Sequence, residues 1–422
     1  MSPSPSPTFG PLAGCRVLEL CTTIAGPVCT RLLADFGAEV IKVEPPSGDP
    51  ARALGFSDDG VSLTGVTLMR NKRAVIIDLK APGGRDLVLD LAAKCDIVVE
   101  NFRPGTLERL GLGYEDMRQK NPGLILTRIS GYGQTGPDRH KAGYGAICEA
   151  FGGIRHLTGD PDRPPARVAV PITDYVSALY AAFGTMLALL EKQRSGRGQV
   201  VDTALYEAAF SMMETSVPAY DRLALVPNRL GTRLPAMAPN NLYLAHDGTF
   251  VLIAANSQNV YQRLCRAMDR PDLIDDPRFA TIRSRWEHVD ALDAIIGEWV
   301  GSRAAADVET TLEAANVPTS RVLTLPDIFD NAHYRAREML LSVPHARLGS
   351  VALAGIVPKL STTPGEVRWA GPEAGSDTRR VLHDLLGLDS ATLDRLQADG
   401  VIVNHAPSDD APRMNEHPSP ME

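Results

Sequence analysis

Short apolar runs alternate with amphipathic stretches through the first half of the chain. The apolar runs predict five strands, and the stretches between them predict helices; the strands are expected at 16–20, 38–44, 74–79, 96–100 and 124–130. A strand, a helix and a second strand in succession form a βαβ unit, which requires parallel strands. The pattern therefore predicts a doubly wound α/β domain.

The longest helix is expected from Thr173 to Ser195. Its large apolar residues recur at helical spacing, which predicts that this face is buried; they are Val176, Leu179, Tyr180, Phe183, Leu187 and Leu190. Thr173 and Asp174 are typical of helix N-caps, and Gly196 follows a basic last turn as a stop signal. Asp174 would lie at the positive end of the helix dipole, which favours an ionised carboxylate. Two interpretations stay open: Asp174 only caps the helix, or it has a chemical role.

The second half of the chain indicates another, smaller domain. A Pro-containing irregular stretch precedes a predicted hairpin at 241–254, several helical segments follow, and two short helices are expected at 378–386 and 390–398. The expected organisation is a disordered tail at 1–10, a large domain at 11–215, a linker at 216–240, a small α+β domain at 241–330, a linker at 331–345, a return to the large domain at 346–403, and a disordered tail at 404–422.

Composition narrows the class of protein. A chain of 422 residues with 44% hydrophobic and 22% charged residues is typical of a soluble globular protein with room for two domains. The net charge of −8 argues against a nucleic-acid partner. We find no run of about 18 apolar residues and expect no membrane span. The first ten residues lack the features of a signal peptide, so a cytoplasmic location is expected.

The sequence indicates neither a metal site nor a dinucleotide-binding site. The six cysteines form no Cys-x-x-Cys pair and the nine histidines show no ligand spacing with them, so neither a metal site nor a disulfide framework is predicted. The stretch 131–136 matches G-x-G-x-x-G, but a polar loop follows it where a dinucleotide site needs a helix. We interpret it as a glycine turn at the end of a strand.

Six motifs occur in a fixed order between about Pro11 and Val403. They are Ala25-Gly26-Pro27, Ile41-Lys42-Val43-Glu44, Asn71-Lys72-Arg73, Glu100-Asn101-Phe102-Arg103-Pro104-Gly105, Gly131-Tyr132-Gly133, and Asp174 at the head of a helix that closes with Ser195-Gly196-Arg197-Gly198-Gln199. In this order the chain resembles the class III coenzyme A transferases, the family of formyl-CoA transferase, carnitine CoA-transferase and succinyl-CoA-dependent dicarboxylate transferases.

This resemblance implies both a fold and a mechanism. The fold would be a Rossmann-like large domain built from both chain ends, an inserted small domain, and a homodimer of interlocked subunits. Asp174 would be the nucleophile that attacks an acyl-CoA thioester, giving a mixed anhydride and then an aspartyl-CoA thioester. Coenzyme A would be part of the substrate, and no prosthetic group or metal would be needed.

The resemblance also implies a set of coenzyme A contacts. The residues at matching positions are Thr23, Ala25, Lys72, Arg73, Asn101, Phe102, Arg109, Arg139, Lys141 and Tyr144. The basic members of this set can meet phosphates by charge-assisted hydrogen bonds. For each of them the alternative is a solvated basic surface residue, and for Phe102 the alternative is ordinary packing.

The chain also departs from its relatives. Pro45 follows the second strand, where formyl-CoA transferase has Arg, and no run of four glycines occurs near 239–248, so specificity for formate and oxalate is not expected. Gly143-Tyr144-Gly145 stands where the racemase branch has Gly-His-Asp, which removes one base needed for racemisation. We therefore expect CoA transfer from a donor such as succinyl-CoA to a small carboxylic acid. The alternatives are a 2-methylacyl-CoA racemase or isomerase and a non-catalytic CoA-thioester-binding protein.

Overall fold

The computed structural model describes residues 9–405, so the predicted tails at 1–10 and 404–422 lie almost entirely outside the described residues. Contacts divide the chain into two compact units. Among the described residues, the larger unit contains 9–154, 169–217 and 335–405, and the smaller unit consists of 155–168 and 218–334. The segment 155–168 thus groups with the smaller unit, although the sequence had assigned it to the large domain.

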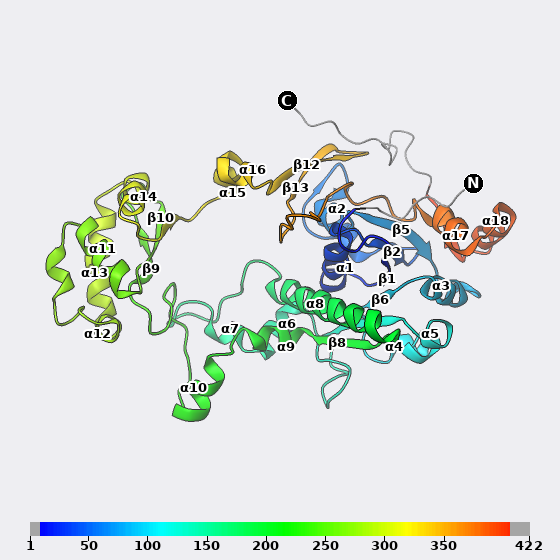
Figure 1. The fold of residues 1–422 in the computed structure, drawn as a ribbon, viewed down its shortest axis with the longest axis horizontal. Helices are drawn as coiled ribbons and strands as arrows, with labels where there is room; N and C mark the ends of the chain where they lie inside the picture. The colour runs from blue at the N-terminus through cyan, green and yellow to red at the C-terminus, as the bar shows by residue number, and fades with distance from the viewer. Residues whose placement is uncertain (1–8, 406–422) are drawn as a thin grey trace. The chain divides into compact units, whose positions relative to one another are not determined.

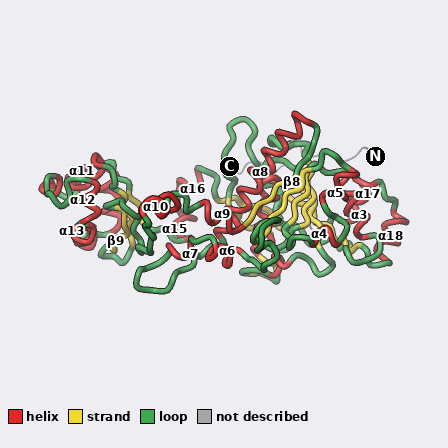
Figure 2. The backbone as a smooth tube through the Cα atoms, turned by 90° about the horizontal axis from the view of Figure 1, so that it is seen from below, coloured by secondary structure: helices red, strands yellow, loops and turns green. Residues whose placement is uncertain are grey.

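A seven-stranded sheet forms the centre of the larger unit, with the strand order β14-β5-β2-β1-β6-β7-β8. The strands are β1 (Arg16–Leu20), β2 (Glu39–Glu44), β5 (Lys72–Ile77), β6 (Ile97–Glu100), β7 (Ile125–Ser130), β8 (Val200–Ala204) and β14 (Ile402–Val403). All neighbouring strands are parallel except β14, which is antiparallel to β5. Every residue of β2, β6 and β7 is buried, as expected for parallel strands covered on both faces. The predicted α/β fold is confirmed (Figure 2).

Helices cover both faces of this sheet (Figure 1). One core contains apolar residues of α3 (Gly84–Ala93), α4 (Thr106–Arg109), α5 (Tyr114–Lys120), α17 (Thr378–Leu386) and α18 (Ser390–Ala398). The opposite core contains residues of α1 (Ala25–Asp35), α2 (Leu63–Leu68) and α8 (Ile172–Ser195). The remaining elements of the larger unit are η1 (Pro50–Ala53), β3 (Ser57–Asp58), β4 (Val61–Ser62), α6 (Gly145–Phe151), α9 (Leu205–Ser211), β12 (Leu340–His345) and β13 (Gly349–Ala354). Helices α7 (Ile154–Leu157) and α10 (Ser216–Leu223) begin in the larger unit and continue into the smaller one.

The smaller unit has its own sheet and core. Its antiparallel strands are β9 (Asn240–Leu244), β10 (Phe250–Ala254) and β11 (Thr319–Arg321), which confirms the predicted hairpin. Its helices are α11 (Gln258–Ala267), η2 (Pro271–Ile274), α12 (Ile282–Glu287), α13 (Val289–Gly301), α14 (Ala305–Ala314), α15 (Leu325–Asp330) and α16 (Ala332–Ala336). The segments expected to be linkers contain regular structure, since α10, α16 and β12 lie within them.

The prediction for the buried face of α8 is wrong. Leu179, Phe183, Leu187 and Leu190 have between 50% and 61% of their surface exposed. The side chains buried against the sheet and α1 are small instead; they are Thr173, Ser177, Ala178, Ala181, Thr185 and Ala188. Small residues let the helix axis approach its neighbours closely, so the tightly packed face is the one with little apolar volume. The predicted stop is confirmed, because Gly196 caps the helix in a left-handed conformation and donates its N–H to Lys192 O.

By length and composition, α8 is also apolar enough to cross a membrane, with a mean hydropathy of 1.3 over its best window. Helices from the cores of soluble proteins pass the same test, so this property is weak as an indication of a membrane. Here one side of α8 already packs on the sheet and α1. The exposed apolar side therefore needs its own explanation.

Candidate functional site

The carboxyl ends of the parallel strands define the edge of the sheet where ligands are expected. Across the sheet, the strand numbers fall from β5 through β2 to β1 and then rise from β6 through β7 to β8. The direction in which strands are added thus changes between β1 and β6, which makes this pair a topological switch point. Helix α8 begins at the same edge, because β8 follows it and runs parallel to β7. Its last turn lies at the opposite edge, where Lys192 Nζ contacts Asp96 Oδ1 at 2.8 Å just before β6 begins.

The loop after β1 is held rigidly at the switch point. The Asn101 side chain accepts a hydrogen bond from Thr22 N–H at 2.8 Å and donates one to Thr22 O at 2.7 Å. Thr23 has a φ of +70°, a left-handed conformation that is strained for a β-branched residue, and its N–H donates to Asp49 Oδ1 at 3.1 Å. Both polar atoms of the Asn101 side chain therefore support this loop, and the direct coenzyme A contact predicted for Asn101 stays a prediction.

A cluster of buried charges lies beneath that loop. Lys42 Nζ contacts Glu19 Oε1 at 2.8 Å and Asp49 Oδ2 at 2.6 Å, and Lys72 Nζ contacts Glu19 Oε2 at 2.8 Å. Burial alone would raise the pKa of Glu19, but the two ammonium groups outweigh it and lower the pKa to about 2. For Lys72, burial together with the charge of Lys42 outweighs the attraction of Glu19, so its pKa is lowered. The side chain of Lys72 is 1% exposed, so it lies in the core, where this structure gives no support to the phosphate contact predicted for it.

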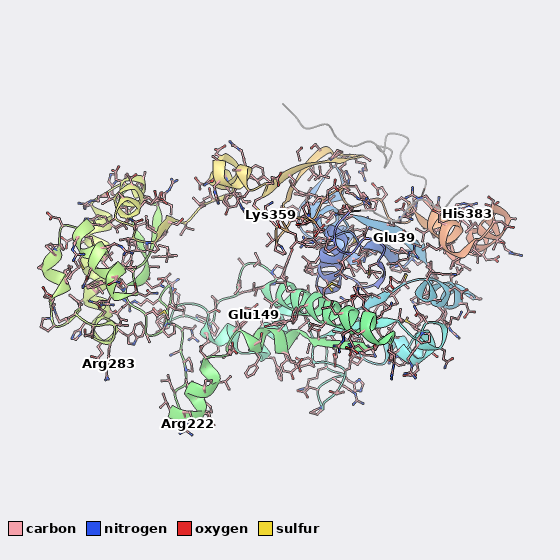
Figure 3. The ribbon with its side chains drawn as sticks, in the orientation of Figure 1. Glu39, Glu149, Arg222, Arg283, Lys359 and His383 are labelled. Atoms are coloured by element: carbon pink, nitrogen blue, oxygen red, sulfur yellow. The ribbon has the colours of Figure 1, made fainter. Side chains whose placement is uncertain are left out.

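Arg73 also lies away from the carboxyl edge. Its guanidinium contacts Glu39 Oε1 at 3.1 Å, and the other oxygen of Glu39 accepts from Arg16 Nε at 2.8 Å. Glu39 and Arg16 are the first residues of β2 and β1, so this cluster belongs to the amino edge of the sheet; Glu39 is labelled in Figure 3. This position does not support the coenzyme A contact predicted for Arg73.

A second ion-pair network fixes the loop after β6. Phe102 N–H donates to Glu100 Oε2 at 2.7 Å, Arg128 Nε donates to Glu100 Oε1 at 2.7 Å, and Arg128 Nη1 donates to Glu108 Oε1 at 2.7 Å. Burial raises the pKa of Glu100 to about 7 in spite of Arg128. Phe102 is half-buried and packs on the core beneath α4. The network thus joins the backbone of Phe102 to α4, which carries Arg109.

Four of the other residues predicted to contact coenzyme A have exposed side chains. Arg109, Arg139, Lys141 and Tyr144 are all exposed, with Tyr144 at 74%. Lys141 contacts Asp138 at 2.9 Å, and Arg109 donates to Thr106 Oγ1 at 2.9 Å. Ala25, the first residue of α1, is 4% exposed, so it offers little side-chain surface to a ligand.

Asp174 is the third residue of α8 and is half-buried. The N-cap position is occupied by Pro171, and no side chain caps the helix, so the interpretation of Asp174 as an N-cap is wrong. The carboxylate lies against the first turn of α6: a Cβ built on Gly145 would be 1.9 Å from Asp174 Oδ2. Burial and the charge of Asp174 raise the pKa of Cys148, one turn further along α6, to about 11. Cys148 is therefore a neutral thiol at neutral pH.

Comparison with known proteins shows the family of the chain. The model of CoA-transferase family III matches residues 12–378. The chain belongs to CoA-transferase family III. It is therefore a class III CoA-transferase, as the order of its motifs had indicated.

Several members of family III are similar over nearly their whole length. The chain is 46% identical to succinyl-CoA–D-citramalate CoA-transferase of Chloroflexus aurantiacus, over 93% of this chain and 98% of the relative. It is 33% identical to succinyl-CoA:glutarate CoA-transferase of Mus musculus, over 94% of this chain and 91% of the relative. A crystal structure of a CAIB/BAIF family protein from Brucella suis superposes with a TM-score of 0.80 at 31% identity, covering 90% of this chain and all of that one.

For this family III enzyme, sequence reasoning placed Asp174 on the right helix but missed its neighbours. The contact with Gly145 has a weak sequence signal, the closely spaced glycines 143 and 145 after the glycine turn. No sequence signal indicates the hydrogen bonds between Asn101 and Thr22, because 79 residues separate the two. Among residues 9–405, no group of three or more His, Cys, Asp or Glu side chains lies together as a metal site would require.

Proposed function

We propose that this enzyme transfers coenzyme A from succinyl-CoA to a small dicarboxylic acid, with Asp174 as the nucleophile. The observation that carries the proposal is the carboxylate of Asp174 in the first turn of α8, at the carboxyl edge of a parallel sheet. The loop with Thr23 follows β1 and helix α4 with Arg109 follows β6, so both follow strands at the same edge. Relatives named for their activities use succinyl-CoA with citramalate, malate or glutarate. These relatives support succinyl-CoA as the donor and a dicarboxylic acid as the acceptor.

The proposed reaction needs only this carboxylate. An oxygen of Asp174 attacks the thioester carbon of succinyl-CoA, the C–S bond breaks, and the coenzyme A thiolate leaves a mixed anhydride. The thiolate then attacks the aspartyl carbonyl, which releases succinate and leaves an aspartyl-CoA thioester. The acceptor carboxylate attacks that carbonyl in turn, and the released thiolate attacks the acceptor's acyl group, so Asp174 is restored. No proton is gained or lost in this cycle.

Coenzyme A itself would be bound by the exposed basic residues of the edge loops. Arg109, Arg139 and Lys141 are the proposed phosphate contacts, since their charged groups reach solvent. Tyr144 offers an exposed ring for stacking with the adenine. The backbone of Thr23 and Ala25 at the start of α1 would meet the pantetheine arm.

The reaction is tested by trapping. The purified enzyme is incubated with succinyl-CoA and hydroxylamine, and the peptides are analysed by mass spectrometry; a hydroxamate is expected on Asp174. Asp174→Ala should lose transfer of coenzyme A to citramalate, malate and glutarate. Asp307→Ala is a matched control, because Asp307 is also the third residue of its helix, α14, but lies exposed in the smaller unit. Full activity of Asp174→Ala would refute the mechanism, and exchange of the α-hydrogen in D₂O without an acceptor would indicate a racemase instead.

The exposed apolar face of α8 supports a homodimer. Leu179, Phe183, Leu187 and Leu190 follow one another at helical spacing on a single side of the helix, and contiguous apolar patches of this kind mark interfaces. A second copy of the chain would cover this face through the same surface on both subunits. Light scattering should show a dimer for the natural protein and a monomer for Leu187→Asp. Leu325→Asp, at a 70% exposed position of the smaller unit, should leave the dimer intact; an equally stable Leu187→Asp dimer would exclude this face.

A further inference from the structure

Gly145 stands closer to the carboxylate of Asp174 than any other residue type would allow. A Cβ at this position would lie 1.9 Å from Asp174 Oδ2 and 2.8 Å from its Cγ. Ordinary carbon contacts need more than about 3.4 Å, so a methyl group here overlaps the carboxylate. The backbone of Gly145 is not in the left-handed region, so glycine is required here by space and not by conformation.

The polypeptide on the Gly145 side cannot easily move away. The loop before α6 packs backbone against backbone on the end of β7, since a Cβ on Gly131 would be 3.0 Å from the Cα of Gly143. One turn into α6, the thiol of Cys148 donates to Gly131 O at 3.3 Å. The glycine turn that follows β7 therefore serves to hold the first turn of α6 in place.

The Asp174 side is equally constrained. Thr173 and Ser177 are buried on either side of it, and the Ser177 hydroxyl donates to Thr173 O at 2.6 Å. Ala178 and Ala181 continue this face with no exposed surface. The start of α8 is thus seated tightly on the core. A clash at position 145 would have to be relieved by turning the carboxylate itself.

We propose that Gly145 is the positioning residue for Asp174: its missing side chain leaves the only space in which the carboxylate can keep its present orientation. This inference rests on the proposed role of Asp174 as nucleophile. In Gly145→Ala the carboxylate turns away from this orientation while the coenzyme A contacts of the other loops are unchanged. Because displacing a reacting group by about 1 Å can reduce a rate about 100-fold, kcat should fall by at least that factor.

The first experiment separates kcat from KM. Gly145→Ala should lower kcat about 100-fold or more, keep KM for succinyl-CoA within threefold, and reduce the yield of hydroxamate on Asp174 in the trapping assay. Gly297→Ala is the control: Gly297 lies inside α13, and a Cβ there would be 3.8 Å from Tyr243, an ordinary contact. That variant should keep full activity. A Gly145→Ala enzyme with kcat within threefold of the natural value would overturn the inference.

A double-mutant cycle tests the contact without relying on activity. If the added methyl clashes with the carboxylate, Gly145→Ala should lower the melting temperature in the natural protein and leave it unchanged in an Asp174→Ala background. An equal loss of melting temperature in both backgrounds would mean that the added methyl clashes with a group other than the carboxylate, and would overturn the inference. The same comparison decides the matter if Gly145→Ala folds poorly. This test is independent of the proposed mechanism. Full activity of Asp174→Ala would refute the role of Asp174 as nucleophile, whereas the double-mutant cycle would still measure the contact between position 145 and Asp174.

Discussion

Replacing Glu19 by Gln should destabilise the larger unit severely. Glu19 is fully buried on β1 and accepts hydrogen bonds from Thr30 Oγ1 at 2.6 Å, Lys42 Nζ at 2.8 Å and Lys72 Nζ at 2.8 Å. Gln preserves the shape but removes the charge and turns one acceptor atom into a donor that faces an ammonium. Lys72 would keep only the carbonyl of Pro27 as an acceptor of full strength.

Two arguments give the same magnitude for this loss. Burial opposes ionisation of Glu19, yet Lys42 and Lys72 lower its pKa from 4.5 to about 2, and such a shift corresponds to about 3 kcal/mol of folding free energy. Removing one partner from a buried ion pair typically costs about 3–5 kcal/mol. We therefore expect Glu19→Gln to lower the free energy of unfolding of the larger unit by about 3 kcal/mol.

Urea unfolding followed by Trp369 fluorescence measures this loss. Trp369 lies in the larger unit, and its indole N–H donates to Lys72 O at 3.1 Å; the chain's other two tryptophans, both in the smaller unit, are first replaced by Phe. Asp90→Asn is the control, because its pair with Lys120 is about half exposed and should contribute less than about 1 kcal/mol. A loss below 1 kcal/mol for Glu19→Gln would refute the reasoning.

The natural protein and Glu19→Gln should also differ in how their unfolding free energies depend on pH, and the direction of this difference follows from the pKa of Glu19. The pKa of Glu19 is lower in the folded state, so its contribution is complete above about pH 4.5, the unfolded value, and disappears as the pH falls toward 2. The difference in unfolding free energy between the natural protein and Glu19→Gln should therefore shrink on acidification from pH 5 to pH 2.5. A difference that stays constant over this range would contradict the assignment of the charge to Glu19.

Three further substitutions test the supports of the site and of the smaller unit. Thr23→Gly should raise the unfolding midpoint by an amount equivalent to about 1 kcal/mol, because glycine adopts a φ of +70° without strain; thermal melting measures it. Asn101→Ala removes both hydrogen bonds to Thr22 and should raise KM for succinyl-CoA about tenfold in steady-state kinetics, with the melting temperature lowered only modestly. Arg285→Met should destabilise the smaller unit by about 3 kcal/mol in urea unfolding, because this fully buried guanidinium donates to three backbone carbonyls and stacks on Tyr261.

The sheet could be predicted because its strands are short, apolar and buried on both faces. The predicted strands at 16–20 and 124–130 agree with β1 and β7 to within one residue. Their spatial order could not be derived from the runs themselves, since each run is equally apolar. That order decides which loops meet, and it is the reason that Thr22 and Asn101 lie together.

Lys72 shows where sequence patterns mislead about a site. A lysine at the start of a strand is usually solvated, and a basic residue in a matching motif suggests a phosphate contact. Its burial depends on Glu19, 53 positions away, which is itself one of the apolar strand's few polar residues. Only the pairing of β2 with both β1 and β5 brings these charges together, so the signal lies in the topology and not in the local sequence.

Helix α8 shows the same limit of sequence patterns for packing, and its packing also affects the candidate site. Both of its sides are apolar, so helical periodicity alone favours the side with the larger residues as the buried one. The structure buries the small side instead, with Ala178 and Ala181 against the core, and this close approach is what brings Asp174 down onto Gly145. A helix seated by large residues would stand further from its neighbours, and its first turn would leave a gap beneath the carboxylate. The small side therefore sets the position of Asp174, the proposed nucleophile, while large residues such as Phe183 stay exposed on the face that we propose as the dimer interface.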